Sequence, residues 1–144
     1  MQIYRTWWHT KYDIKAHLVW CPKYRKRVLY GIVSKRLQEI IRIICMQHDI
    51  KIISGKLAVD HVHLFVSYPQ KLSVSSMMQY LKWWSSYKIL KEYPEIKERY
   101  YWWNHFWQRW YLAVSSWSIT DELVKEYIDN QYGDEIEWYI ELEE

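Results

Sequence analysis

Two histidines separated by one residue are the part of this chain best suited to chemistry. His61 and His63 lie in an apolar stretch, residues 56–67, that we interpret as a β-strand. Alternate residues of a strand project to the same face, so the two imidazoles stand side by side with their Cα atoms roughly 7 Å apart. Two adjacent neutral imidazoles make half of a divalent-metal site. The alternative is an ordinary pair of histidines on a half-exposed sheet face.

A tyrosine and a glutamine near the other end of the chain add two candidate groups. Tyr127 and Gln131 are i and i+4 in a predicted helix, so they share one face and can point into one site. The amide oxygen of Gln131 could be a third metal ligand beside His61 and His63. Tyr127 could then attack a phosphodiester, because a cation that polarises the phosphoryl group compensates for a tyrosine pKa of about 10. The alternatives are a packing tyrosine, one of 14 in the chain, and a surface amide.

Mg²⁺ and Mn²⁺ are the metal ions that these groups favour. Mg²⁺ prefers an octahedral shell rich in oxygen, whereas two imidazoles suit Mn²⁺ better. A shell completed by water and phosphate oxygens accommodates either ion. Asp60 is expected to point to the opposite face of the strand, where it would support the site rather than ligate the metal. For His17 we expect a packing or surface role.

The charge of the chain is distributed unevenly. The net charge is +3, but residues 134–144 contain six carboxylates and no Lys or Arg. Residues 1–133 therefore carry 20 basic against 11 acidic residues, a net +9. Such a basic body favours a polyanionic partner, because neutralised phosphates release counterions, although a solvated basic surface is the alternative. The candidate DNA-contacting residues are Lys23, Arg25, Lys26, Arg27 and Arg109.

The composition is typical of one intracellular domain. The 144 residues suffice for a single domain over residues 1–133, followed by an acidic tail over 134–144. Apolar runs fall short of the roughly 20 residues that cross a bilayer, and the first residues lack a signal-peptide core, so we expect a cytoplasmic protein without membrane contact. Cys21 and Cys45 are expected to be free thiols. The 11 Trp and 14 Tyr are compatible with stacking on single-stranded bases.

The order of predicted elements indicates an α+β fold. Without its last helix the order is β-α-β-β-α-β, the ferredoxin-like arrangement with one antiparallel sheet, and the last element is an additional C-terminal helix. The expected elements are a strand over 12–20, a loop over 22–27, a helix from Val33, a strand over 50–53 that turns at Gly55 into the histidine strand, a helix from Ser73 to before Pro94 with the apolar face Val74, Met77, Met78, Leu81 and Trp84, a strand over 107–115 and a helix over 120–133.

This topology explains how distant residues could meet. Both helices of a ferredoxin-like fold pack on one sheet face, which Val62, Leu64 and Val66 would join. Val59, His61, His63 and Phe65 would then point to the open face. The C-terminal helix is the element left to cover that face, and it would bring Tyr127 to the histidines.

Four segments resemble the small single-tyrosine HUH transposases of prokaryotic insertion sequences that move as single-stranded DNA. The segments are residues 17–27, 60–66, 105–109 and 127–131. The resemblance runs in order through about residues 10 to 132. The combination is specific to this group, whereas His-Val-His alone is not.

The resemblance implies a DNA transposase that cleaves and rejoins single strands at the ends of the element. Tyr127 would become linked to a 5′ phosphate and release a 3′ hydroxyl, while His61, His63 and Gln131 hold Mg²⁺ or Mn²⁺. Family members act as homodimers on single-stranded DNA with hairpin ends, and the tyrosine helix of one subunit can complete the site of the other. Another HUH endonuclease, such as a replication initiator or relaxase, is one alternative. A non-catalytic single-stranded nucleic-acid-binding module is the other.

The chain departs from the family in its glycines. The resemblance implies glycine at Trp84, Trp103, Trp110 and Trp117, yet the whole chain contains only three glycines. Glycine permits close backbone approach and positive φ, which tryptophan adopts only with strain.

Overall fold

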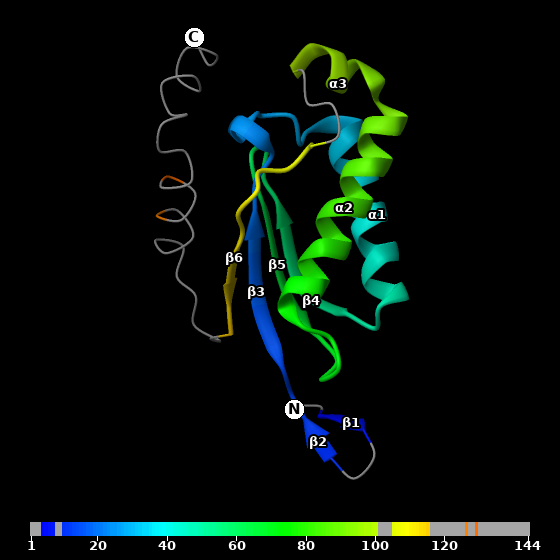
Figure 1. Cartoon of the computed structure of the whole chain (residues 1–144), viewed down its shortest axis with the longest axis vertical. Coiled ribbons are helices and arrows are strands. Elements are labelled where there is room, and N and C mark those ends of the chain that lie inside the picture. Colours follow the sequence, from blue (N-terminus) through cyan, green and yellow to red (C-terminus); the bar gives the residue numbers. More distant parts are fainter. Residues whose placement is uncertain (1–3, 8–9, 101–104, 116–125, 127–128, 130–144) are drawn as a thin grey trace.

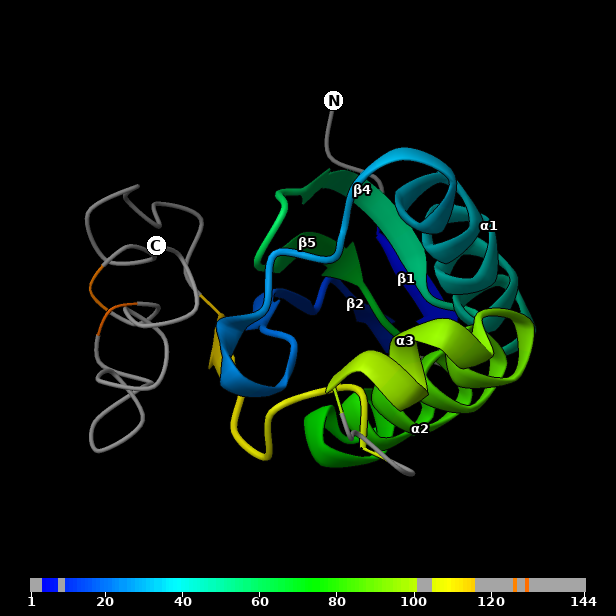
Figure 2. The same ribbon diagram turned by 90° about the horizontal axis from the view of Figure 1, so that it is seen from above.

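A computed structural model describes residues 4–7, 10–100, 105–115, 126 and 129. A four-stranded antiparallel sheet in the order β4-β5-β3-β6 is covered on one face by helices α1 and α2 (Figures 1 and 2). A two-stranded hairpin, β1-β2, precedes it. The elements are β1 (Arg5–Trp7), β2 (Thr10–Tyr12), β3 (Lys15–Trp20), the 3₁₀ turn η1 (Lys23–Arg25), α1 (Gly31–Gln47), β4 (Lys51–Leu57), β5 (Val62–Ser67), α2 (Val74–Glu92), α3 (Pro94–Tyr100) and β6 (Leu112–Val114).

The predicted α+β, ferredoxin-like arrangement is confirmed. From β3 to β6 the elements follow the order β-α-β-β-α-β, apart from the short helices η1 and α3, and each neighbouring pair of strands is antiparallel. The central pair β3-β5 aligns Val19 with His63 and His17 with Phe65. The predicted helix over 120–133 lies mostly outside the described residues, of which Glu126 and Asp129 are helical. The acidic tail over 134–144 also lies outside them.

The core lies between the sheet and its two helices. Val62, Leu64 and Val66 of β5 are at most 2% exposed and belong to this core, as the strand alternation predicts. The helices contribute apolar residues at three- and four-residue spacing, which places them on one face. These buried helical residues include Leu37, Ile40, Ile41 and Ile44 of α1 and Met77, Met78, Leu81 and Ile89 of α2.

The predicted turn at Gly55 is wrong, because Gly55 lies inside β4 opposite Leu64. A Cβ atom at Gly55 would lie 2.9 Å from Cδ2 of Leu64, so the glycine permits a close approach of the two strands. The chain reverses further on, where the amide of Ala58 donates to the carbonyl of His61 at 3.0 Å. A glycine in a strand thus marks tight packing here rather than a turn.

The second predicted helix has the right ends but one wrong face residue. Ser73 caps α2 by accepting a hydrogen bond from the amide of Ser76 at 3.1 Å, and the helix ends at Glu92, before Pro94. Trp84, predicted to be on the buried face, is 42% exposed, and Ser85 is fully buried next to it. Pro94 itself begins α3, a short helix that was not predicted from the sequence.

Two predicted strands are shorter than expected. The predicted strand over 12–20 divides into β2, which ends at Tyr12, and β3, which begins at Lys15. The predicted strand over 107–115 reduces to β6, with Trp107 joined to Pro22 as an isolated bridge. None of the described helices is both long enough and apolar enough to span a membrane.

Candidate active site

The histidine pair lies at the start of β5. His63 is the second residue of β5 and His61 directly precedes the strand. Because Val62, Leu64 and Val66 occupy the helix side, the alternation of the strand places His63 and Phe65 on the opposite sheet face. Both histidines are half-buried, and 17% of the His61 side chain is exposed. His63 and Phe65 therefore lie on the sheet face expected for them.

Asp60 fixes the orientation of the His61 ring. Its Oδ1 lies 2.8 Å from Nδ1 of His61. A carboxylate that accepts from Nδ1–H leaves Nε2 as the lone-pair nitrogen. His61 is therefore arranged as histidine ligands are, with Asp60 in the supporting role expected from the sequence.

Asp60 is held in its ionised form by two neighbours. Burial would raise the pKa of this carboxyl, but hydrogen bonds from His61 and from Nε of Arg25, at 2.9 Å, outweigh burial and bring the pKa to about 2. At neutral pH the group is a carboxylate. It can thus stabilise positive charge on His61, or on an ion bound by it, without a proton change of its own.

His17 reaches the pair from the neighbouring strand. Its Nδ1 lies 3.1 Å from Nε2 of His63, and its ring stacks on Phe65 with centroids 4.2 Å apart. The residue is 7% exposed. Of these two nitrogens, one must carry the proton and donate to the other. His17 therefore orients His63 from β3, which agrees with the packing role expected for it.

The histidines fit a divalent ion as part of a larger shell. Nδ1 of His61 is held by Asp60, which leaves Nε2 of His61 as its ligating nitrogen, and Nε2 of His63 lies against Nδ1 of His17. Over the described ranges, no group of three or more His, Cys, Asp or Glu side chains is arranged to hold a metal ion. The predicted third ligand Gln131 and the predicted nucleophile Tyr127 lie outside those ranges, so both stay predictions.

The predicted basic loop is a strained turn with divided roles. Tyr24 and Arg25 have positive φ values of 59° and 52°. The Arg25 guanidinium faces protein carboxylates, Asp60 at 2.9 Å and Asp129 at 3.7 Å. Burial, with Arg99 nearby, lowers the pKa of Lys26. Lys23 is half-buried and Arg27 is exposed.

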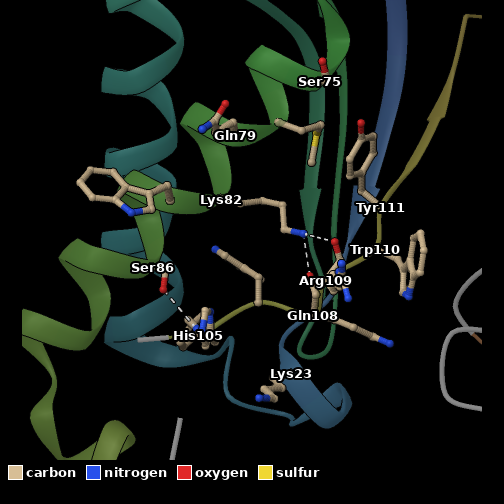
Figure 3. A pocket seen from close by; sticks show the side chains of 14 residues that line it. Lys23, Ser75, Gln79, Lys82, Ser86, His105, Gln108, Arg109, Trp110 and Tyr111 are labelled. Atoms are coloured by element: carbon tan, nitrogen blue, oxygen red, sulfur yellow. Dashed lines mark hydrogen bonds between the residues drawn. The ribbon is translucent and has the colours of Figure 1, made fainter. Parts of the chain in front are cut away.

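A pocket of about 770 Å³ lies between α2 and residues 105–111 (Figure 3). Its lining includes Lys23, His105 and Arg109, so two of the predicted DNA-contacting residues meet there. Lys82 crosses it from α2 and donates to the carbonyl oxygens of Gln108 at 2.6 Å and Arg109 at 2.9 Å. The pocket combines cationic groups with aromatic walls, a combination that suits a nucleic-acid strand.

Lys82 also lines this pocket, although the sequence predicted no role for it. Burial lowers its pKa to about 8, although the nearby Cys21 acts in the opposite direction. Its position could have indicated burial, because Lys82 lies four residues after Met78 and four before Ser86, which are both buried, on the same side of α2.

Solved structures share this fold. A transposase from Deinococcus radiodurans matches with a TM-score of 0.79 and 24% identity, over 88% of this chain and 97% of that one. A second structure, a REP-associated tyrosine transposase bound to a REP hairpin, matches with a TM-score of 0.53 and 14% identity, over 95% of this chain and 74% of that one. At sequence identities of 24% and 14%, these matches show a shared fold only.

Sequence comparison identifies the family. The transposase for insertion sequence element IS200 of Salmonella typhimurium is 32% identical over 123 residues, which cover 85% of this chain and 80% of that protein. The ISDra2 transposase TnpA of Deinococcus radiodurans is 32% identical over 124 residues, 86% of this chain and 88% of that protein. The model of the family "Transposase IS200 like" matches residues 10–131. The chain, with its histidine pair on the sheet and its basic pocket, belongs to the IS200-like transposase family.

Proposed function

We propose that this transposase cleaves and rejoins single-stranded DNA at the ends of an insertion sequence through a 5′-phosphotyrosine intermediate. Tyr127 is the nucleophile, and His61, His63 and Gln131 hold Mg²⁺ or Mn²⁺. The observation that carries the proposal is the histidine pair on the sheet face opposite the helices, with His61 oriented by the ionised Asp60. Membership of a transposase family supplies the class of reaction.

The proposed reaction conserves the phosphodiester bond energy. The Tyr127 oxygen attacks phosphorus, a bond between tyrosine oxygen and phosphorus forms, and the bond to the 3′ oxygen breaks. The tyrosine proton is lost, and the released 3′ oxygen takes up a proton. A bound divalent cation would supply electrostatic stabilisation of the phosphoryl oxygens. Rejoining reverses these steps when a 3′ hydroxyl attacks the phosphotyrosine, so ATP is not required.

The DNA partner in this proposal is a single strand with hairpin ends. A related fold is described as bound to a REP hairpin, which supports the same kind of ligand here. Lys23, Lys26, Arg27 and Arg109 are the candidate phosphate contacts, and Lys23 and Arg109 line one pocket. The guanidinium of Arg25 is already paired with the carboxylate of Asp60, at 2.9 Å, so Arg25 is the weakest of these candidates. A homodimer, with Tyr127 acting in its own or its partner's site, belongs to the proposal.

The test is formation of an SDS-stable protein–DNA adduct. The protein is incubated with labelled single-stranded element-end DNA and Mn²⁺, then separated under denaturing conditions. We expect an adduct for the unaltered protein and for Tyr87→Phe, an exposed tyrosine of α2 that serves as control. Tyr127→Phe and the double variant His61→Ala/His63→Ala should form none.

Two outcomes would contradict the proposal. An adduct that persists in Tyr127→Phe assigns the nucleophile to another residue. Tight binding without any adduct, across several end sequences and both metals, favours a non-catalytic single-strand-binding module.

A further inference from the structure

The segment of residues 106–109 is held against helix α2 by two buried serines. Ser85 and Ser86 are 0% and 7% exposed. The indole Nε1 of Trp107 donates to Oγ of Ser85 at 2.8 Å, and the amide of Phe106 donates to Oγ of Ser86 at 3.1 Å. Because breaking a buried hydrogen bond leaves its polar groups without water, these two contacts fix the first half of the segment.

Lys82 fixes the second half of the segment from the preceding turn of α2. Its Nζ donates to the carbonyl of Gln108 at 2.6 Å and to the carbonyl of Arg109 at 2.9 Å, and it lies 5.8 Å from the centroid of the Tyr111 ring (Figure 3). An ammonium group has three donors, and two successive carbonyls accept from it here. One cation therefore fixes the path of two peptide groups.

The ammonium of Lys82 costs the fold free energy. Lys82 is half-buried, and burial lowers its pKa to about 8 because it disfavours the charged form. An apolar side chain of similar size at this position would avoid that cost. The charge is therefore better explained by a role in the site than by the stability of the fold.

The same segment is bonded on its other side to the residues that lead into η1. The amide of Gln108 donates to the carbonyl of Cys21 at 2.8 Å, and the amide of Lys23 donates to the carbonyl of Phe106 at 2.9 Å. The peptide groups of Gln108 thus bind Cys21 on one side and Lys82 on the other. A shift of the segment away from α2 would move the start of η1 with it.

From η1 the contacts continue to the histidine pair. Tyr24 and Arg25 have positive φ, a conformation that non-glycine residues keep only when the surroundings impose it. In this conformation Nε of Arg25 lies 2.9 Å from Oδ2 of Asp60, whose other oxygen lies 2.8 Å from Nδ1 of His61. The orientation of His61 therefore depends on where η1 is held.

We propose that Lys82 is a positioning residue, which fixes segment 106–109 and, through η1 and the contact of Arg25 with Asp60, keeps the ring of His61 in its orientation. The inference rests on the proposed function, in which His61 is a metal ligand. It does not make Lys82 a contact of a DNA phosphate, because two of the three donors of its ammonium are used by protein carbonyls.

The first test measures the ring of His61 in the protein without DNA or metal. Lys82→Met is compared with Lys88→Met, which removes the same charge from an exposed residue of the same helix. Nitrogen NMR just above neutral pH shows which ring nitrogen of His61 carries the proton. We expect the proton on Nδ1 in the unaltered protein and in Lys88→Met, and a partial loss of this tautomer in Lys82→Met. Hydrogen exchange of the Lys23 amide should also be faster in Lys82→Met alone.

The second test measures the metal requirement of the reaction. With saturating element-end DNA, the Mn²⁺ midpoint of adduct formation should rise roughly three- to ten-fold in Lys82→Met and stay unchanged in Lys88→Met. In an Asp60→Asn background, Lys82→Met should add little, because the contact through which it acts is already lost. DNA affinity without metal should be the same in Lys82→Met and Lys88→Met.

Three results would overturn the inference. An unchanged His61 tautomer in Lys82→Met shows that Lys82 does not orient the ring, and a changed tautomer with an unchanged Mn²⁺ midpoint shows that the orientation has no consequence for the reaction. A loss of DNA affinity at an unchanged midpoint makes Lys82 a phosphate contact. An equal rise of the midpoint with and without Asp60→Asn shows that Lys82 acts by another route.

The two tests also separate this inference from the proposed function. If the unaltered protein forms no adduct, the proposed function fails, while the tautomer still shows whether Lys82 orients His61. If the adduct forms and Lys82→Met behaves as Lys88→Met in both tests, only the role of Lys82 is wrong.

Discussion

At the scale of single residues, Asp60 is the group on which the candidate site depends most. It accepts hydrogen bonds from His61 and from Arg25 with its two oxygens, and it is ionised at neutral pH. Two donors compensate for the free energy of burying this carboxylate. Removing the carboxylate would leave both donors without their acceptor. The orientation of His61 therefore depends on a residue that is not itself a metal ligand.

We predict that Asp60→Asn raises the Mn²⁺ concentration that adduct formation requires. Replacing a residue that supports a metal-binding histidine typically costs roughly 10- to 100-fold in metal affinity or activity. The measurement is a Mn²⁺ titration of adduct formation. Asp49→Asn is the control, because it breaks a comparable ion pair with Arg5, at 3.0 Å, without contact to the histidines. An unchanged Mn²⁺ midpoint in Asp60→Asn would show that His61 needs no support.

Lys82 provides a prediction about pH. Its pKa is about 8 in the folded protein, below the ordinary value of 10.5, because burial disfavours the charged form. Between these pH values the unfolded chain binds more protons at this position, so Lys82 makes the free energy of unfolding rise with pH. Urea unfolding at pH 7 and pH 9.5 should show a larger increase for the unaltered protein than for Lys82→Met. A parallel change in both proteins would place the Lys82 pKa outside this window.

At the scale of elements, the close approach of β4 and β5 decides how the histidine strand is held. Gly55 faces Leu64 across the pair, and Leu64 is 2% exposed in the core. Leu64 lies next to His63 in the chain, so a shift of this part of β5 would also move His63. The glycine thus permits the close spacing of the two strands beside His63.

We predict that Gly55→Ala destabilises the protein by about 1–3 kcal/mol, the usual cost of overpacking a core. The added Cβ would lie 2.9 Å from Cδ2 of Leu64, which must move within a packed interior. Urea unfolding measures the change. Ser54→Ala, at the neighbouring exposed position of β4, should have little effect. Equal stability of the two variants would mean that Leu64 can relax freely.

At the scale of the whole molecule, the five tryptophans whose burial the structure describes divide into two groups. Trp20 and Trp107 are 0% and 5% exposed, whereas Trp83, Trp84 and Trp110 are 58%, 42% and 65% exposed. Large aromatic residues are normally well buried. The exposed rings of Trp83 and Trp110 line the pocket beside α2.

What the sequence by itself determined is local. Alternation predicted that Val62, Leu64 and Val66 face the core, and capping and spacing predicted where α2 begins and ends. These patterns are set by neighbours within a few residues, so they can be read without the fold. The motif residues also indicated the family correctly.

What only the tertiary structure decided are contacts between distant residues. Gly55 was predicted to be a turn because the approach of Leu64 is not visible in the sequence, and the contact of Arg25 with Asp60, 35 residues away, is not visible there either. The pairing of His17 with His63 likewise depends on the register of β3 with β5. Such contacts arise when strands and helices pack, and their partners carry no signature in the local sequence.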